Sequence, residues 1–169
     1  MKIKFLVSII VLFCGLQNTR AQTEKQIVNI RTEVAAINKS AARYAKTTKD
    51  IEGVSLEGTQ TTFYVSGEKL KKISAKIYGE TFNASAEFYY HGEELIFAFQ
   101  KINRYDTQIG LEKPPKIARV EESRLYFSGG KMIRLLNGKI PVKSSDIRFT
   151  EKEYEIVELS GQLKSAFNR

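Results

Sequence analysis

Few residues of this chain have side chains that could carry out catalysis. Its 169 residues include one histidine, His91, and one cysteine, Cys14, but no tryptophan. A histidine that acts as a general base needs a nucleophile beside it and a third group that orients its ring. His91 precedes Gly92 at a predicted turn tip, and a solvated tip is a poor place to assemble three such groups. We therefore expect His91 to be an ordinary turn residue.

Paired carboxylates are the other candidates for chemistry. Glycosidases use two carboxyl groups roughly 5 to 9.5 Å apart, one of them as a general acid. The chain offers two adjacent pairs, Glu93-Glu94 and Glu121-Glu122. Neighbouring residues of a strand face opposite sides of the sheet, so one acid from each pair would have to meet in space. A carboxylate-based glycan hydrolase stays open as an alternative on that condition alone.

Metal and cofactor chemistry lacks its usual residues. With one histidine and no cysteine after Cys14, the chain offers no disulfide, thiol nucleophile, thiolate metal site or multi-histidine metal site. Gly129 and Gly130 fall in a predicted hairpin and not before a helix, so they do not form a phosphate loop. We expect no catalytic residue, no cofactor and no metal ion.

The first 21 residues have the features of a secretory signal. Lys2 and Lys4 precede an almost wholly apolar run over 5–16, and small residues stand at Thr19 and Ala21. Twelve helical residues rise only about 18 Å, which is short of the roughly 30 Å hydrocarbon core. We predict cleavage after Ala21; an uncleaved anchor is the alternative. A lipid anchor on Cys14 is not expected, because Phe13 stands where a small residue is needed.

Charge and composition suggest where the mature chain works. Removal of Lys2, Lys4 and Arg20 with no acid lowers the formal net charge from +8 to +5. A mildly basic exported protein meets acidic glycans or lipid head groups more readily than nucleic acid. An exported chain without cysteines is typical of the periplasm or the extracellular space of a Gram-negative-type bacterium. No transmembrane segment is expected after cleavage.

Residues 22–169 form one predicted α+β domain that begins with a helix over 22–50. Its apolar residues recur at intervals of three and four. They are Ile27, Ile30, Val34, Ile37, Ala41 and Tyr44. We interpret this stripe as a helix packed on a sheet; a dimer formed through residues 23–47 is the alternative.

Residues 59–142 predict an antiparallel β-meander of about six strands. Three segments, 63–70, 88–95 and 125–132, share an apolar residue, a tyrosine, a glycine three residues later and a closing Leu or Met. Each is expected to be a strand, a glycine turn and a second strand. Leu95, Phe97 and Phe99 should form one apolar row.

Two further segments complete the predicted domain. Residues 103–120 lack periodicity and contain Pro114-Pro115, so they predict a long loop. Residues 150–167 predict a second helix, with Thr150 and Glu153 as its capping box. Both helices are expected to cover the apolar side of the sheet.

The tyrosine–glycine–leucine segments resemble MORN-type repeats and the F-Y-x-x-G-x-x-L units of uncharacterised exported bacterial proteins. The resemblance covers residues 59–138. It implies a binding or scaffolding role and carries over no active-site residue.

The candidate binding surface consists of recurring tyrosines, basic residues on the hairpins and two residues of the predicted loop. They are Tyr64, Tyr89, Tyr126, Lys72, Lys76, Arg124, Arg134, Tyr105 and Pro114. A tyrosine row on an open face would bind a glycan or a peptide, whereas on a covered face it belongs to the core.

These patterns favour a non-catalytic binding or accessory protein of the cell envelope, with a protein or glycan partner. An inhibitor or immunity protein that acts through the 103–120 loop is the alternative, because a stiff loop loses less entropy on binding.

Overall fold

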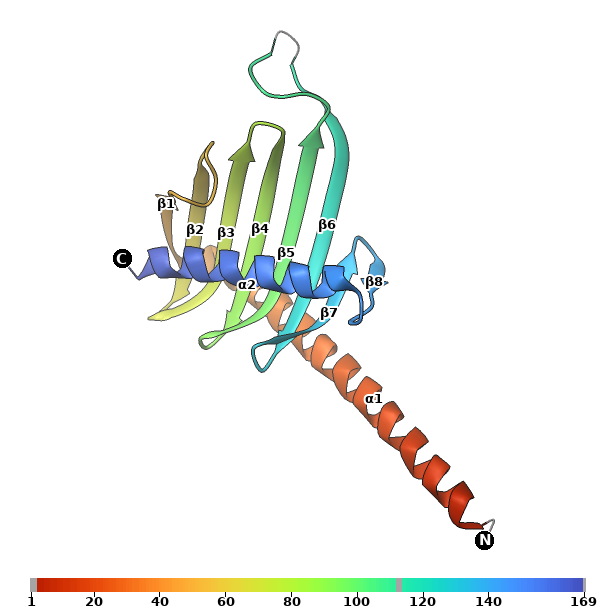
Figure 1. Cartoon of the computed structure of the whole chain (residues 1–169). Coiled ribbons are helices and arrows are strands. Elements are labelled where there is room, and N and C mark those ends of the chain that lie inside the picture. Colours follow the sequence, from red (N-terminus) through yellow and green to blue (C-terminus); the bar gives the residue numbers. More distant parts are fainter. Residues whose placement is uncertain (1–2, 112–113, 169) are drawn as a thin grey trace.

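The computed structural model describes residues 3–111 and 114–168, with side chains described from Arg20 onward. Lys2 of the predicted signal and positions 112–113 of the predicted loop therefore lie outside the described residues. The chain has a helix at each end, α1 (Ile3–Ser40) and α2 (Ile147–Phe167), and a sheet between them (Figure 1). The predicted α+β class, with a meander between two helices, is confirmed.

The sheet is fully antiparallel and each strand pairs with the next one along the chain, in the order β1 to β8. The strands are β1 (Ala45–Asp50), β2 (Thr59–Ser66), β3 (Lys69–Gly79), β4 (Phe82–His91), β5 (Glu94–Tyr105), β6 (Ile117–Ser128), β7 (Lys131–Asn137) and β8 (Ile140–Val142). The prediction of about six strands was wrong because it lacked the two edge strands, β1 and β8.

Strand β1 occupies residues that were predicted to be helical. Helix α1 ends at Ser40, a short 3₁₀ turn follows over Ala41–Arg43, and Tyr44 is extended with φ −76° and ψ 146°. The β-branched pair Thr47-Thr48 then pairs with β2, as their strand propensity favours. The predicted helix over 22–50 is thus too long by ten residues at its end. The predicted cleavage position after Ala21 falls inside α1.

The three glycine segments form the hairpins β2–β3, β4–β5 and β6–β7 with the same local geometry. In each, glycine holds the first turn position, with φ of 61° at Gly67, 58° at Gly92 and 58° at Gly129. Two-residue hairpin turns require this positive φ. In each hairpin the register also shifts directly after the tyrosine, so one extra residue bulges from the returning strand.

Helix α1 covers one face of the sheet with the predicted apolar stripe. Ile27 and Ile30 pack against Tyr126, and Ile37 packs against Tyr89 and Ile96. The stripe is therefore buried against the sheet of the same chain, and a dimer through residues 23–47 stays a prediction.

Helix α2 covers the opposite face and encloses the larger core. Ile156 and Leu163 of α2 are fully buried in one cluster with Phe63, Phe88 and Leu125. In Figure 1, α2 crosses in front of the strands and α1 passes behind them. The two helices therefore shield both faces of the sheet, and not one apolar side as expected.

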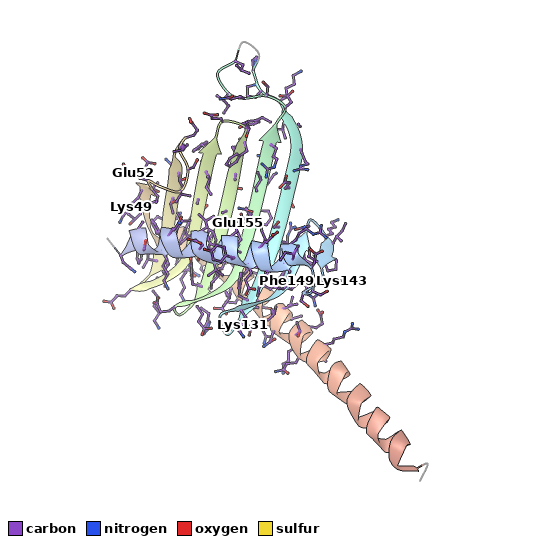
Figure 2. All side chains as sticks on the ribbon, in the orientation of Figure 1. Lys49, Glu52, Lys131, Lys143, Phe149 and Glu155 are labelled. Atoms are coloured by element: carbon purple, nitrogen blue, oxygen red, sulfur yellow. The ribbon has the colours of Figure 1, made fainter. Side chains whose placement is uncertain are left out.

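Helix α2 begins three residues earlier than predicted. Asp146 is its N-cap, and its Oδ1 accepts a hydrogen bond of 3.0 Å from the backbone N–H of Arg148. Glu153, expected in a capping box with Thr150, accepts a hydrogen bond from the backbone N–H of Met132 instead. Phe149 lies in the first turn of α2, and at the other end Lys49 of β1 donates to the carbonyl of Ala166 at 2.8 Å (Figure 2).

The predicted loop over 103–120 is shorter, because β5 continues to Tyr105 and β6 begins at Ile117. Residues 106–116 remain as the connection, closed at its neck by two hydrogen bonds between Asp106 and Lys116. Next to this connection, β5 and β6 extend beyond both helices (Figure 1). Neither helix covers the ends of these strands, so their sequence shows no alternation of apolar and polar residues. Over the described residues, neither helix combines the length and apolarity that crossing a bilayer requires.

Candidate functional site

The predicted tyrosine row does not form an open surface. Tyr89 is 1% exposed and Tyr126 is 3% exposed, because α1 lies across both. The Tyr89 hydroxyl lies 3.0 Å from Asn38 Oδ1, and the Tyr126 hydroxyl accepts from Arg31 Nε at 3.2 Å. These two tyrosines hold α1 on the sheet, which corrects their assignment to a binding surface.

Lys72 is also a structural residue and not a surface cation. Its Nζ donates to Glu87 at 2.7 Å and to Asn38 at 3.1 Å, and it lies 4.9 Å from the centre of the Tyr89 ring. Burial and the hydrogen bond to Glu87 raise the pKa of the Tyr89 phenol far above its ordinary value. The phenol thus stays neutral and the network stays intact over the physiological pH range.

The remaining predicted residues on this face are scattered. Arg134 forms an ion pair with Glu24 of α1. Arg124 stacks over Phe99, with its Cζ 5.0 Å from the ring centre. Lys76 is exposed and pairs with Gln60, whereas the half-buried Tyr64 pairs with Lys72 further along the two strands.

The two loop candidates lie apart from these. The Tyr105 hydroxyl accepts a hydrogen bond of 2.6 Å from Asn83, so Tyr105 is tied to β4. Pro114 is exposed in the connection between β5 and β6. The nine predicted residues therefore form no single site.

Two of the candidate catalytic groups, His91 and Glu93, contact side chains of the two helices. His91 Nδ1 lies 2.7 Å from Glu33 of α1, and Glu93 accepts from Lys164 of α2 at 2.6 Å. The hydrogen bond from Lys164 lowers the pKa of Glu93. Glu121 faces the α2 side and Glu122 the other side, as their partners Ile102 and Lys101 show.

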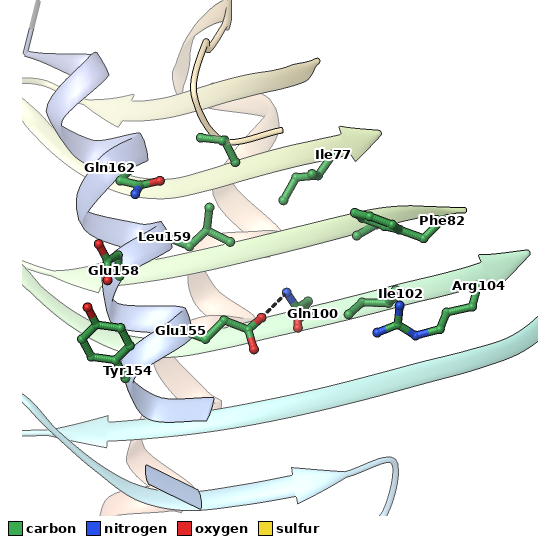
Figure 3. A pocket seen from close by; sticks show the side chains of 12 residues that line it. Ile77, Phe82, Gln100, Ile102, Arg104, Tyr154, Glu155, Glu158, Leu159 and Gln162 are labelled. Carbon is green, nitrogen blue, oxygen red and sulfur yellow. Dashed lines mark hydrogen bonds between the residues drawn. The ribbon is translucent and has the colours of Figure 1, made fainter. Parts of the chain in front are cut away.

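The structure reveals a different candidate site, a groove of about 560 Å³ between α2 and the far half of the sheet. Its floor is apolar and is supplied by three long strands, through Ile77 of β3, Ala84 of β4 and Ile102 of β5. Phe82 closes the floor toward the strand ends. Figure 3 shows Ile77, Phe82 and Ile102 on the strands beside α2.

The α2 wall of the groove is polar and acidic. Glu155 accepts a hydrogen bond of 3.1 Å from Gln100 of β5 (Figure 3). Lys152 donates to both Gln100 and Glu155. One turn along, a hydrogen bond to Glu158 raises the pKa of the Tyr154 phenol. Leu159 is the apolar residue of this wall.

The opposite end of the groove is basic. Arg104 lies there, remote from α2 in Figure 3, and its side chain is 45% exposed. Its Nε donates to Glu121 at 2.7 Å, and Arg119 also forms an ion pair with Glu121. The hydrogen bond from Arg104, followed by that from Arg119, lowers the pKa of Glu121. Two arginines thus share one carboxylate, and this end keeps a net positive charge.

Sequence reasoning missed the groove, although one signal pointed to it. An α-helix with its side chains is about 10 to 12 Å wide, whereas a strand of twelve residues spans about 40 Å. Helix α2 crosses the strands in Figure 1 and cannot cover their whole length. Apolar residues that continue past the crossing, such as Ile77 and Ile102, must then line an open groove.

Comparison of the chain with protein-family models, curated proteins and solved structures finds no match.

Proposed function

We propose that this protein is a non-catalytic binding protein of the cell envelope that takes up its ligand in the groove between α2 and the sheet. The groove is the observation that carries the proposal. Its volume of about 560 Å³ lies within the roughly 300 to 1,000 Å³ of ligand sites, which combine an apolar lining with a few placed polar groups. The floor of Ile77, Ala84 and Ile102 supplies the apolar lining, and Gln100 and Arg104 supply the polar groups.

The state of the carboxylates supports a non-catalytic role. A glycosidase general acid needs a raised pKa so that it stays protonated near neutral pH. Glu93 and Glu121 have lowered pKa values because of their basic partners. Among the described residues, no three His, Cys, Asp or Glu side chains gather in a way that could hold a metal ion.

Export to the envelope rests on the first 21 residues, and it has its own test. Intact-mass analysis of the protein recovered from envelope fractions should show a chain that begins at Gln22. Recovery from the cytoplasm alone would contradict export, whereas an envelope chain that still carries residues 1–21 would contradict cleavage after Ala21.

The groove is tested by filling it. Ala84 lies on the floor, whereas its neighbour Ser85 is exposed on the opposite face of β4. Fluorescence of anilinonaphthalene sulfonate, an anionic dye with apolar rings, should rise on mixing with the wild-type protein. Ala84→Trp should abolish this rise, and Ser85→Trp should leave it unchanged.

A second filling variant guards against misfolding of Ala84→Trp. Gln162 lies on the exposed α2 wall, so Gln162→Trp narrows the groove without entering the core. Equal dye binding by wild type and both filling variants would remove the groove as the site. Loss of binding in Ser85→Trp alone would move the site to the other face, where Lys76 and Lys101 suit an envelope glycan.

The connection between β5 and β6 supports a second candidate function, inhibition of a partner protein. Ile109 is 52% exposed and Leu111 is 60% exposed, which is unusual for apolar residues of a connection that is held in place. The backbone N–H of Ile109 donates to the Glu80 carbonyl at 2.8 Å, and Gln108 binds the Glu80 side chain at 2.7 Å. A partner would therefore meet an apolar surface that is already ordered.

This second function predicts that Ile109→Ser with Leu111→Ser reduces recovery of a partner from envelope extract. The matched control is Val28→Ser with Leu56→Ser, which removes two other exposed apolar side chains far along the chain. Equal recovery by both double variants would remove the loop as the partner-binding element.

A further inference from the structure

We infer that the ligand of the groove is a single acyl chain that ends in a carboxylate, with the chain over the floor and the carboxylate at Arg104. This inference names the ligand class and rests on the groove being the binding site, as proposed above.

The apolar part of the argument comes from the floor. Ile77, Ala84 and Ile102 lie on three adjacent strands and present no polar side-chain atom. Leu159 lies on the α2 side of the groove. An occupant therefore contacts apolar side chains both from the sheet and from α2. A groove of about 560 Å³ lies in the lower half of the range for ligand sites, which favours one chain over a two-chain lipid.

The position of the charged groups gives the occupant a direction. At the α2 side an acidic end group would meet Glu155 and Glu158, which together exceed their partner Lys152 by one negative charge. At the far side it would meet Arg104, where Arg104 and Arg119 together exceed Glu121 by one positive charge. Like charges repel and opposite charges attract, so the acidic group belongs at Arg104.

The geometry of Arg104 suits a carboxylate in particular. The guanidinium contacts Glu121 through Nε, and among the described residues its two terminal nitrogens form no hydrogen bond. A guanidinium binds a carboxylate through two parallel N–H groups. The terminal nitrogens can therefore donate hydrogen bonds to a second carboxylate, that of the ligand, while Glu121 stays bound to Nε.

Competing occupants make different demands. A second copy of the chain in the groove would make the emission of the Tyr154→Trp protein depend on protein concentration and leave it unchanged by palmitate. An uncharged apolar ligand would use the floor but would not depend on Arg104. Both are outcomes of the experiment below, and either would overturn the inference.

The experiment uses the absence of tryptophan from the chain. Tyr154 is exposed and lines the groove, so Tyr154→Trp places the only tryptophan of the chain at the site. Palmitate, kept below its micelle concentration, should shift the emission to shorter wavelength in a saturable way. Cetyl alcohol, which has the same chain length but no charge, should bind about tenfold or more weakly, as expected for loss of a charge-assisted hydrogen bond.

Two variants in the Tyr154→Trp background assign the preference to one residue. Arg104→Gln should reduce palmitate affinity to that of cetyl alcohol. Arg119→Gln removes an equal positive charge that is also paired with Glu121, but Arg119 does not line the groove. This variant should therefore keep most of the preference for palmitate. Equal affinity for both compounds in the parent protein, or an unchanged preference in Arg104→Gln, would overturn the inference.

The same titrations separate this inference from the proposed function. If cetyl alcohol binds as tightly as palmitate and Ala84→Trp abolishes both, the groove is the site but the acidic ligand is wrong. If palmitate binds equally to the Ala84→Trp protein, both the inference and the proposed function fail.

Discussion

Tyr89 and Tyr90 are neighbours in β4, yet each holds a different helix on a different face of the sheet. The Tyr89 hydroxyl lies 3.0 Å from Asn38 Oδ1 of α1, and the Tyr90 hydroxyl lies 2.7 Å from Ser160 Oγ of α2. Both rings are almost fully buried. Strand β4 therefore contacts both helices through hydrogen bonds. Helix α2 forms the groove on one face of the sheet, and α1 packs on the opposite face.

Tyr90→Phe should lower the free energy of unfolding by about 1 to 3 kcal/mol, because it leaves Ser160 Oγ buried without a partner. Tyr90→Phe with Ser160→Ala should recover most of the loss, since both polar groups are then gone. Tyr154→Phe, on the exposed side of the same helix, serves as the control and should change little. Urea denaturation measures all three; a double variant no more stable than Tyr90→Phe would argue against this hydrogen bond.

The two tyrosines also make stability fall at alkaline pH. Burial raises the pKa of both Tyr89 and Tyr90 in the folded protein, whereas in the unfolded chain each loses its proton near pH ~10. Above that pH unfolding releases protons, so the free energy of unfolding decreases as the pH rises. Denaturation at about pH 8 and about pH 11 should show this decrease, and Tyr89→Phe with Tyr90→Phe should flatten it. An equally steep decrease in the double variant would contradict the assignment.

Packing of α1 on the sheet is tested by two adjacent residues. Ile27 is fully buried against the sheet, while Val28 is 56% exposed. Ile27→Ala should cost about 2 to 5 kcal/mol, as large-to-small changes in a core do, and Val28→Ala should cost much less. Similar losses in both variants, or a loss that depends on protein concentration, would favour a dimer through α1 instead.

Asp146 should contribute stability that is lost in acid. The hydrogen bond from the Arg148 side chain, and then that from its backbone N–H, lowers the pKa of Asp146 to about 2. The folded state thus favours the carboxylate, and its contribution disappears as the pH falls from about 4 toward about 2. Asp146→Asn keeps a capping side chain but loses the charge, so its thermal midpoint should lie below that of wild type near neutral pH and converge with it near pH ~2. Asp146→Ala should be lower than both, and a constant difference across pH would contradict this account.

The general architecture could be predicted because its signals are local. The three-and-four spacing of Ile27, Ile30 and Ile37 fixed the buried side of α1, and glycine at positive φ fixed the turns. The start of α2 was misplaced because Asp146 and Thr150 are both suitable caps, and their competition is decided by contacts such as that of Arg148 with Asp146.

The assignment of side chains to faces could not be read from alternation alone. Leu95, Phe97 and Phe99 were expected in one row, but the register shift after Tyr89 places Leu95 in the α2 core and Phe97 under α1. A bulge adds one residue and reverses the face of everything beyond it. The groove was hidden for a related reason, because it depends on strand lengths and on where α2 crosses them.

The central claim is that ligand enters the groove beneath α2, and mapping of amide chemical shifts in the wild-type protein during titration with palmitate tests it most directly. The account predicts that the largest changes fall on residues 77–84, 100–104 and 154–162, on both sides of the groove. Changes confined to Lys76, Ser85 and Lys101 on the opposite face, or no saturable change at all, would contradict it.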